Sequence, residues 1–509
     1  MHWHPKKSAQ ERTVAERLRR SSKFYRFLWE IREELFADGF ERELIASYEP
    51  RGQQPCPPAL LAMVMLLQRY DGLSDADAVD AAENDRRWQL VLGTLGHDQA
   101  PFGQGSLVRF RTRMVAHDLD KKLVQRTVEL AKKKGSFGWK NLRVALDSSP
   151  LVGAGRVEDT WNLIGRAMAK VVHAVALALE LDESVVIKQA GLTVLGADSI
   201  KAALDIDWDD TDAQCEALNR LLAEVSALEA WVAKRTKKPS GPRLQEALQL
   251  LRQVVEQDTE PDPPRGGRRI KQGVPRERIV SVSDPEMRHG RKSQTKLFNG
   301  YKRHIAVVDR LIVGTAIEPA NIAEFEPTSR LLEAAEKHGR IDTLDIDRGY
   351  LSSPAVLKLH RKGTTIYCKP WKSRNFGRFT KDDFHLDLKR RLVTCPAGHR
   401  ASMKPSGAAH FDPDTCGTCE LKKQCTKAKR RTVTVHPAEE LFLQLKSYQR
   451  SPRDRQQLRK RTVVEHRLAR VGAIQGNRAR YRGARNNELD LNRAAAVANL
   501  LELARKQAA

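Results

Sequence analysis

Cysteine is scarce in this sequence: there are seven among 509 residues, and five of the seven lie after residue 367. So few cysteines over such a length do not suggest the disulfide framework that small secreted domains use. In a reducing compartment, a local cluster of thiols indicates a metal site before it indicates disulfides. Cys56, Cys215 and Cys368 stand alone, and we expect them to be small buried residues.

Long apolar runs are also lacking. No stretch approaches the roughly 20 apolar residues that cross a bilayer, and residues 1–7 contain no apolar signal core. Neither a G-x-G-x-x-G motif nor a Walker loop occurs, which argues against a nucleotide-driven motor. These absences predict a cytoplasmic protein that has no membrane partner and can reach DNA.

Acidic residues are outnumbered by basic ones. The 89 lysines and arginines face 64 aspartates and glutamates, which gives a formal net charge of +25. The surplus is spread along the chain and is not confined to a tail, so it indicates a polyanionic partner. We expect nucleic acid of some kind, although composition alone would also fit a ribosome- or RNA-associated protein.

The first 135 residues are predicted to be helical. Apolar residues recur at helical spacing over 60–67, and Ser74 with Asp77 would cap the helix that follows. A later predicted helix has arginines near its N-terminus, at Arg109, Arg111 and Arg113. We interpret this helix as an element that contacts DNA. The alternative is the solvated basic face of a helical packing domain.

Strand signals begin after this helical region, and helices interrupt them. They cover residues 142–147, 279–282, 301–308, 311–317, 341–347 and 364–368. The third and fourth segments look hairpin-linked and a helix separates the last two, which predicts a mixed α/β sheet flanked by helices. After the first strand, Asp159-Thr160 would cap the first helix of a helical insertion.

These patterns divide the chain into four parts. A helical N-terminal domain covers 1–135, and a helical insertion with its linker covers 156–274. The α/β domain is assembled from 136–155, 275–370 and 440–505, and a cysteine-rich insertion occupies 371–439.

Three acidic residues in separate elements carry the strongest functional signal. Asp147 closes the predicted strand 142–147, Asp347 closes 341–347, and Glu465 lies in a helical stretch that begins at Arg461. Mg²⁺ prefers hard oxygen ligands. Two such ions roughly 3.5–4 Å apart stabilise the attacking and leaving oxygens of an in-line displacement at phosphorus. The three carboxylates therefore predict a site for two Mg²⁺ ions, with Mn²⁺ as a possible substitute.

Each carboxylate also has a simpler interpretation. An aspartate at a strand end is more often a turn former or a helix cap. Asp345 competes with Asp347 because strand period places the two on one face. We favour Asp347, which lies at the strand terminus. Glu465 and Arg461, one helical turn apart, could be a surface ion pair that contributes little.

The cysteine cluster consists of Cys395, Cys416, Cys419 and Cys425. Four thiolates can close a tetrahedral zinc site, and Cys416-Gly417-Thr418-Cys419 has the spacing of half such a site. His399 or His410 could replace one cysteine. Free structural thiols and a redox role are the alternatives. Lysines and arginines around the cluster suggest that this small module also touches the DNA backbone.

Together, the ordered blocks resemble the DDE transposases of bacterial insertion sequences. The first block is Ala145-Leu146-Asp147-Ser148-Ser149-Pro150, the second is Asp347-Arg348-Gly349-Tyr350, and the third is Arg461-x3-Glu465 followed by Arg478-Ala479-Arg480-Tyr481-Arg482-Gly483. Ser283-Asp284-Pro285-Glu286, with Gly300-Tyr301-Lys302, is similar to the segment those proteins have before the second catalytic strand. A cysteine cluster before the glutamate recurs in one branch of the family.

The resemblance implies a ribonuclease-H-like core in which Asp147, Asp347 and Glu465 bind Mg²⁺. It implies cleavage at transposon ends, strand transfer into target DNA, and an N-terminal domain that recognises the terminal inverted repeats. Arg461 would clamp a phosphate, and the DNA end would be contacted by Arg478, Arg480 and Arg482. Paired ends make a homodimer the expectation, associated with the nucleoid when it is bound to DNA.

The chain departs from some relatives near the third block. Those relatives have a tyrosine three residues before the arginine and a lysine seven residues after the glutamate, where this chain has Leu458 and Gly472. Lys460 or Arg470 would have to substitute for the missing contacts. Two rival functions stay open: a ribonuclease-H-like nuclease that cuts without joining, and a catalytically inactive or regulatory DNA-binding protein.

Overall fold

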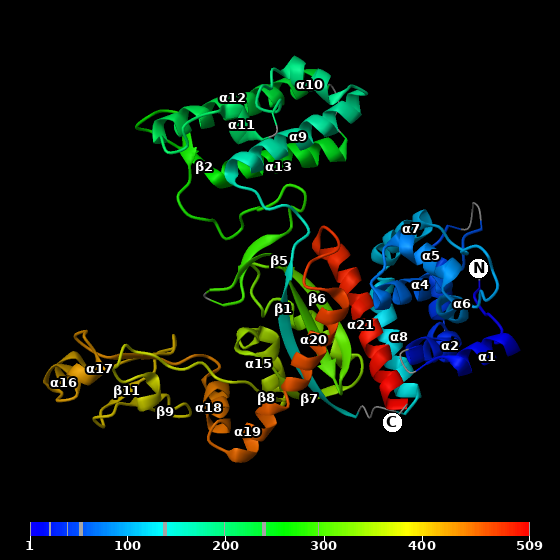
Figure 1. Cartoon of the computed structure of the whole chain (residues 1–509). Helices are drawn as coiled ribbons and strands as arrows, with labels where there is room; N and C mark the ends of the chain where they lie inside the picture. The colour runs from blue at the N-terminus through cyan, green and yellow to red at the C-terminus, as the bar shows by residue number, and fades with distance from the viewer. Residues whose placement is uncertain are drawn as a thin grey trace.

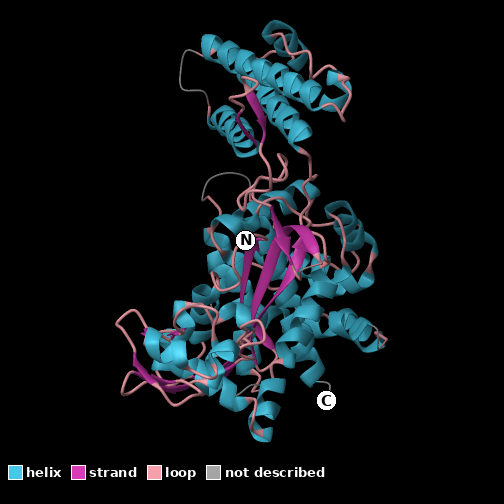
Figure 2. Cartoon of the chain, turned by 90° about the vertical axis from the view of Figure 1, so that its left-hand side faces the viewer, coloured by secondary structure: helices cyan, strands magenta, loops and turns pink. Residues whose placement is uncertain are grey.

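The computed structural model of the chain describes residues 2–19, 22–37, 39–49, 54–135, 140–197, 199–236, 241–293 and 295–507. Figure 1 shows a central sheet with helices against it, and the N-terminal helices to one side. A helical bundle stands beyond one end of the sheet, and a small lobe of short strands and helices lies near the other end, in both Figure 1 and Figure 2. The fold is α/β with a mixed sheet, as predicted.

The main sheet has six strands in the order β4-β5-β1-β7-β8, with β6 paired to β5. The strands are β1 (Asn141–Val152), β4 (Arg288–Arg291), β5 (Leu297–Val308), β6 (Leu311–Pro319), β7 (Arg340–Asp345) and β8 (Thr365–Tyr367). β1 is antiparallel to β5 and parallel to β7, which is parallel to β8. An antiparallel hairpin on one side of β1 and parallel strands on the other are consistent with a ribonuclease-H-like core.

Local sequence explains the hairpin of β5 and β6, but it gave a wrong strand prediction for residues 279–282. β5 and β6 are joined through Asp309 and Arg310, both with positive φ (43° and 69°), as a two-residue hairpin turn requires. The predicted strand over 279–282 is wrong, because that segment is irregular. Its apolar side chains are buried in two different cores: Ile279 and Val282 in the bundle and Val280 in the main core. Residues 279–282 therefore connect the core of the helical bundle to the main core.

Helices joined by short loops make up the described part of the first 135 residues. The helices are α1 (Ala9–Arg17), α2 (Lys23–Leu35), α3 (Phe40–Ala46), α4 (Pro58–Asp71), α5 (Asp75–Asn84), α6 (Arg86–Leu92), α7 (Gln104–Ala116) and α8 (Leu119–Lys133). Ser74 and Asp77 form the predicted capping box at the start of α5. The C-terminal helix α21 (Ala484–Gln507) contacts α4, α8 and β6. One hydrophobic core therefore includes both the N-terminal helices and the sheet.

The helical insertion has its own core. It contains α9 (Thr160–Leu179), α10 (Glu183–Ala190), α11 (Ile200–Leu204), α12 (Thr211–Arg235), α13 (Pro242–Asp258), β2 (Thr259–Pro261) and β3 (Arg268–Ile270). Asp159 caps α9 as predicted, by accepting the N–H of Asn162. Contrary to expectation, α9 is by length and composition apolar enough to cross a membrane, but half of it is buried within the protein. Its packing against α13 makes it the core helix of the bundle, so it is weak evidence for a membrane.

The remaining elements surround the later strands. Helices near the sheet are α14 (Thr328–Glu336), η2 (Arg348–Tyr350), α15 (Pro354–Arg361), α18 (Glu439–Tyr448), α19 (Pro452–Arg459) and α20 (Thr462–Gln475). The small lobe contains η3 (Lys381–Asp383), β9 (His385–Asp387), β10 (Leu392–Thr394), β11 (Arg400–Ser402), β12 (Ala408–His410), α16 (Pro413–Thr418), α17 (Lys422–Cys425) and β13 (Thr432–Thr434). This lobe has a separate small core.

Candidate active site

Asp147, Asp347 and Glu465 line one open cavity of about 610 Å³. They come from three elements: Asp147 lies in β1, Asp347 in the turn after β7, and Glu465 in the first turn of α20. α20 reaches this place because it packs on β1 and β5, with Val464, Leu468 and Val471 buried. Residues distant in sequence therefore meet at one edge of the sheet.

Strand register explains how the two aspartates meet. Asp147 is inside β1 and not at its end as predicted, because β1 continues to Val152. Ala145 and Asp345 are the last paired residues of the parallel strands β1 and β7. Asp147 and Asp347 each follow this pair by two residues, so they leave the parallel part of the sheet at the same edge.

The environment of Asp147 opposes its ionisation. Burial, with a smaller contribution from the charges of Glu465 and Asp347, raises the pKa of Asp147 to about 6. The N–H of Ser148, which donates to Asp147 Oδ1 at 2.9 Å, and the guanidinium of Arg461 act in the opposite direction. Burial outweighs these two effects, so the pKa of Asp147 stays above its ordinary value.

The structure separates Asp345 from Asp347. Asp345 is buried and accepts two hydrogen bonds from Arg143, at 2.6 Å from Nε and 2.7 Å from Nη2. Asp347 is exposed, lines the cavity, and accepts the N–H of Arg348 at 2.7 Å. Only Asp347 has an oxygen free to face the cavity, so the geometry favours it over Asp345 as a metal ligand.

Arg461 lies between two of the three carboxylates. Its Nη1 is 3.5 Å from Asp147 Oδ2, and its Nη2 is ion-paired with Glu465. The surface Arg–Glu pair considered from sequence is therefore present, but it extends to Asp147. Nη1 is buried without a hydrogen-bond partner of good geometry. The Arg461 guanidinium therefore lies beside the carboxylates of Asp147 and Glu465.

Glu324 is a fourth carboxylate in the cavity, and no sequence pattern predicted it. It lies in the irregular segment after β6, and its Oε1 accepts the hydroxyl of Ser148 at 2.9 Å. Gly349 lets it approach the turn after Asp347, because a Cβ on Gly349 would lie 1.9 Å from Glu324 Oε2. No periodicity marks this residue. Only the pairing of β6 beside β5 brings it to the site.

Basic side chains line the same cavity: Arg291, Lys292, Lys302 and Arg303. Burial lowers the pKa of Arg303 to about 10. Its Nε donates to Ser149 at 2.6 Å and its Nη1 to the carbonyl of Gly476 at 2.8 Å. Arg303 therefore joins the end of α20 to β1 and β5. Its role is to hold these elements in place around the cavity.

The block 283–286 supports the start of α21. Asp284 is buried and accepts the Tyr301 hydroxyl at 2.6 Å and the N–H of Gly483 at 3.0 Å. Glu286 accepts the N–H of Ala484 at 2.8 Å. These carboxylates satisfy free N–H groups at the beginning of the helix. Asp284 is thus a structural residue and does not line the cavity of the three carboxylates.

The three arginines after α20 have different environments. Arg478 and Arg482 are exposed. Arg480 is exposed but donates to the carbonyl of Leu73 at 2.9 Å, which ties this segment to the N-terminal helices. Arg482 lines a second cavity with Arg156, Arg166 and Lys170, where Glu158 pairs with Arg156 and Arg166. Arg478 directly follows Asn477, which lines the cavity of the three carboxylates.

The predicted basic helix, α7, presents fewer free arginines than expected. Arg111 is mostly buried and pairs with Asp75 on α5, so it holds two helices together and does not face solvent. DNA contact by Arg111 stays a prediction, and the ion pair with Asp75 competes with it. Arg113 stacks over Tyr48 at 4.2 Å, and it lines a surface cavity with Arg109, which is exposed.

The four clustered cysteines meet in the small lobe. Burial raises the pKa of Cys425, and the neighbouring thiols of Cys395, Cys416 and Cys419 raise it further. Within the described part of the chain, no three of them have sulfurs within 4.8 Å of one another. Zinc binding stays a prediction. Of the isolated cysteines, Cys368 is buried as expected, whereas Cys56 and Cys215 are only partly buried.

Two family models match this chain. One, described as a transposase DDE domain, matches residues 273–500 and so includes Asp347 and Glu465. The other, described as a transposase domain (DUF772), matches residues 12–113. No curated protein and no solved structure matches the chain. With the N-terminal helices and the α/β region matched in the order that the sequence blocks predict, the chain belongs to the DDE transposases of insertion sequences.

Proposed function

We propose that this transposase binds the terminal inverted repeats of its insertion sequence, cleaves the ends by phosphodiester hydrolysis, and joins them to target DNA. The observation that supports it best is the cavity in which Asp147, Asp347 and Glu465 meet among basic side chains. Carboxylates suit catalytic cations, and the basic rim suits a phosphate backbone.

The donor set fits Mg²⁺, with Mn²⁺ as a substitute. All three donors are carboxylate oxygens. Burial and the two neighbouring carboxylates raise the pKa of Asp147, and a bound cation would offset that effect. The carboxylate oxygens of Asp147, Asp347 and Glu465 do not all lie within 4.8 Å of one another. One ion bound by all three residues would require that they did. Two ions about 3.5–4 Å apart spread the ligands further. When bound, such ions supply stabilisation of the attacking and leaving oxygens.

Arg461 has two roles in this proposal. In the free protein its guanidinium stabilises the charges of Asp147 and Glu465. When DNA enters, the planar guanidinium of Arg461 can donate two hydrogen bonds to a phosphate of the DNA backbone. Arg461 then leaves the carboxylates and holds the scissile strand, which frees their oxygens as ligands.

The decisive test is cleavage of a labelled duplex that carries the terminal repeat flanking the element's own gene. We expect nicking at the repeat boundary with Mg²⁺ or Mn²⁺ and none with chelator. The variant Glu465→Gln should lose more than the roughly 10–100-fold that outer-shell partners of a metal cost. If the protein cleaves the duplex but does not join pre-cleaved ends to target DNA, it is a nuclease and not a transposase. Tight binding without cleavage under either metal would indicate a regulatory protein.

Glu324 positions the site in this proposal, through Ser148. Changing Glu324 to Gln keeps the shape but removes a charge next to the catalytic carboxylates, so we expect cleavage to fall about 10–100-fold. The Mg²⁺ concentration for half-maximal activity should rise. The control is Glu326→Gln, which alters an exposed residue of the same segment. Equal activity of both variants would remove Glu324 from the site.

DNA contacts extend beyond the cavity in this proposal. Exposed Arg478 and Arg482, and Arg109 on α7, contact the transposon end, while Arg480 orients the segment. Two copies of the chain hold paired ends, as a homodimer. The protein acts in the cytoplasm, on the nucleoid.

The small lobe binds one structural Zn²⁺ in this proposal, through Cys395, Cys416, Cys419 and Cys425. Thiolate ligands repel one another without a cation, which fits the raised pKa of Cys425. We expect about one equivalent of zinc in purified protein, and cobalt substitution should give thiolate-to-metal charge-transfer absorption. The variant Cys419→Ser should lose both signals, and Cys215→Ser should keep them. Unchanged zinc in Cys419→Ser would exclude the site.

A further inference from the structure

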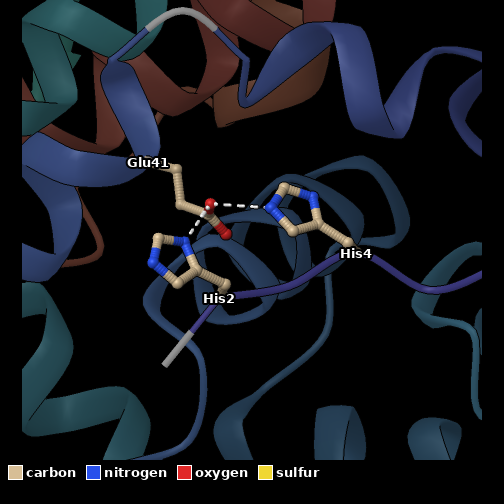
Figure 3. A group of neighbouring side chains, drawn as sticks. All are labelled: His2, His4 and Glu41. Atoms are coloured by element: carbon tan, nitrogen blue, oxygen red, sulfur yellow. Dashed lines mark hydrogen bonds and ion pairs between the residues drawn. The ribbon is translucent and has the colours of Figure 1, made fainter.

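A second group of possible metal ligands lies far from the catalytic cavity, at the start of the chain. Figure 3 shows His2 and His4 on either side of the Glu41 carboxylate. Glu41 Oε2 is 2.8 Å from His2 Nδ1 and 3.3 Å from His4 Nε2. In the described part of the chain, this is the one group in which three such ligand atoms lie within 4.8 Å of one another.

The ligands are held in place by the residue between the two histidines. Trp3 is buried, its indole N–H donates to the carbonyl of Leu92 at 3.3 Å, and its ring packs edge-on against Phe36. The backbone N–H of Trp3 donates to Glu41 Oε1 at 2.6 Å. This leaves Oε2 for the histidines. In an extended segment, residues on either side of a buried one share the opposite face, so His2 and His4 both point at Glu41.

Burial differs among the three side chains in the way a surface metal site requires. Glu41 is 8% exposed, whereas His2 and His4 are 62% and 68% exposed. Buried charges in proteins are paired or coordinate metals, and the ion-pair partners that the structure describes for this carboxylate are the two imidazoles. The exposed imidazoles leave room for water on the outer side of an ion. Two imidazole nitrogens and one carboxylate oxygen form a ligand set typical of divalent transition metals.

We propose that His2, His4 and Glu41 bind one divalent transition-metal ion of the zinc type. The ion joins the first residues of the chain to α3, because His2 and His4 precede α1 and Glu41 lies in the first turn of α3. Residues 2–4 precede the matched region 12–113, so no family model covers two of the three ligands. The site is separate from the carboxylates of the catalytic cavity.

The test is calorimetric titration of the untagged, chelator-treated full chain with ZnCl₂. We expect the double variant His2→Gln/His4→Gln to bind one equivalent fewer than the unaltered chain. Glu41→Gln keeps an acceptor for the Trp3 N–H but loses the charge, and it should weaken that equivalent at least tenfold. The control, His97→Gln, removes an exposed histidine of the same helical region and should bind as the unaltered chain does.

Zinc at the cysteine lobe must be told apart from zinc at this site. Cobalt bound to two imidazoles and a carboxylate gives no thiolate charge-transfer band, so the equivalent lost in the double variant should leave that band unchanged. Equal zinc stoichiometry and affinity in the unaltered chain and the double variant would overturn the proposal. Loss of the charge-transfer band together with the lost equivalent would also overturn it, since the ion would then be at the cysteines.

Discussion

Replacing Asp147 with asparagine is expected to abolish DNA cleavage and strand transfer while making the protein more stable. The loss of activity follows from the removal of a proposed metal ligand, and it should exceed about a hundredfold. DNA binding should be largely kept, because the basic side chains around the cavity are untouched. A variant that still cleaves at the repeat boundary would exclude Asp147 from the site.

The gain in stability follows from the sign of the pKa shift. Burial raises the pKa of Asp147 from 3.8 to about 6, so the folded protein holds this proton more tightly than the unfolded chain does. The stabilisation is fully present below pH 3.8 and is lost as the pH rises through about 6. At pH 7 the ionised Asp147 therefore destabilises the fold, by up to about 3 kcal/mol at roughly 1.4 kcal/mol per pH unit.

Asparagine cannot ionise, but it loses the attraction to Arg461, so we expect a net gain of about 1–3 kcal/mol at pH 7. The gain should disappear near pH 4 and shrink when Mg²⁺ is added to the unaltered protein. Urea unfolding of both proteins from pH 4 to 8, with chelator present, measures it. Asp98→Asn, at an exposed aspartate, is the control. A variant less stable than the parent at pH 7 would show that the Arg461 ion pair outweighs burial.

The sheet could be predicted from the sequence because its signals are local. The apolar runs of β1, β5, β6 and β7 and the short link between β5 and β6 are visible without knowledge of tertiary contacts. Residues 279–282 have the same apolar character but no strand partner, because their side chains are buried in two separate cores. Periodicity cannot report which surface covers a side chain, so this strand prediction failed.

The candidate site was only partly predictable for the same reason. Asp347 could be preferred to Asp345 from its place in the sequence, but the Arg143 ion pair that engages Asp345 is visible only in three dimensions. Glu324 lies in an irregular segment and reaches the cavity through the pairing of β6 with β5. Arg111 follows the basic pattern of its helix, yet Asp75 pairs with it. A single sequence does not show which charged side chains of different elements will pair with one another.

The largest expected loss of stability comes from Asp490, which lies on α21 and faces the N-terminal helices. It is nearly fully buried and accepts hydrogen bonds from Arg493 Nη2 at 2.6 Å and from Arg69 Nη1 at 3.1 Å. Burial alone would lower the pKa of Arg493, but Asp490 and the Tyr481 hydroxyl hold it above its ordinary value. One carboxylate thus pairs with two guanidinium groups, one from each side of the interface between α4 and α21.

Changing Asp490 to Asn keeps the volume but removes the charge of the carboxylate to which both buried guanidinium groups donate. Breaking a buried pair in this way costs about 3–5 kcal/mol. The first urea unfolding transition should move to lower concentration by that free energy. The control, Glu30→Gln, breaks the exposed pair with Arg26 and should cost no more than about 0.5 kcal/mol.

A double variant separates lost charge from lost shape. Arg69→Met combined with Asp490→Asn removes one of the two buried cations, so it should recover part of the stability that Asp490→Asn loses. A loss below about 1 kcal/mol in Asp490→Asn would mean that water reaches both guanidinium groups.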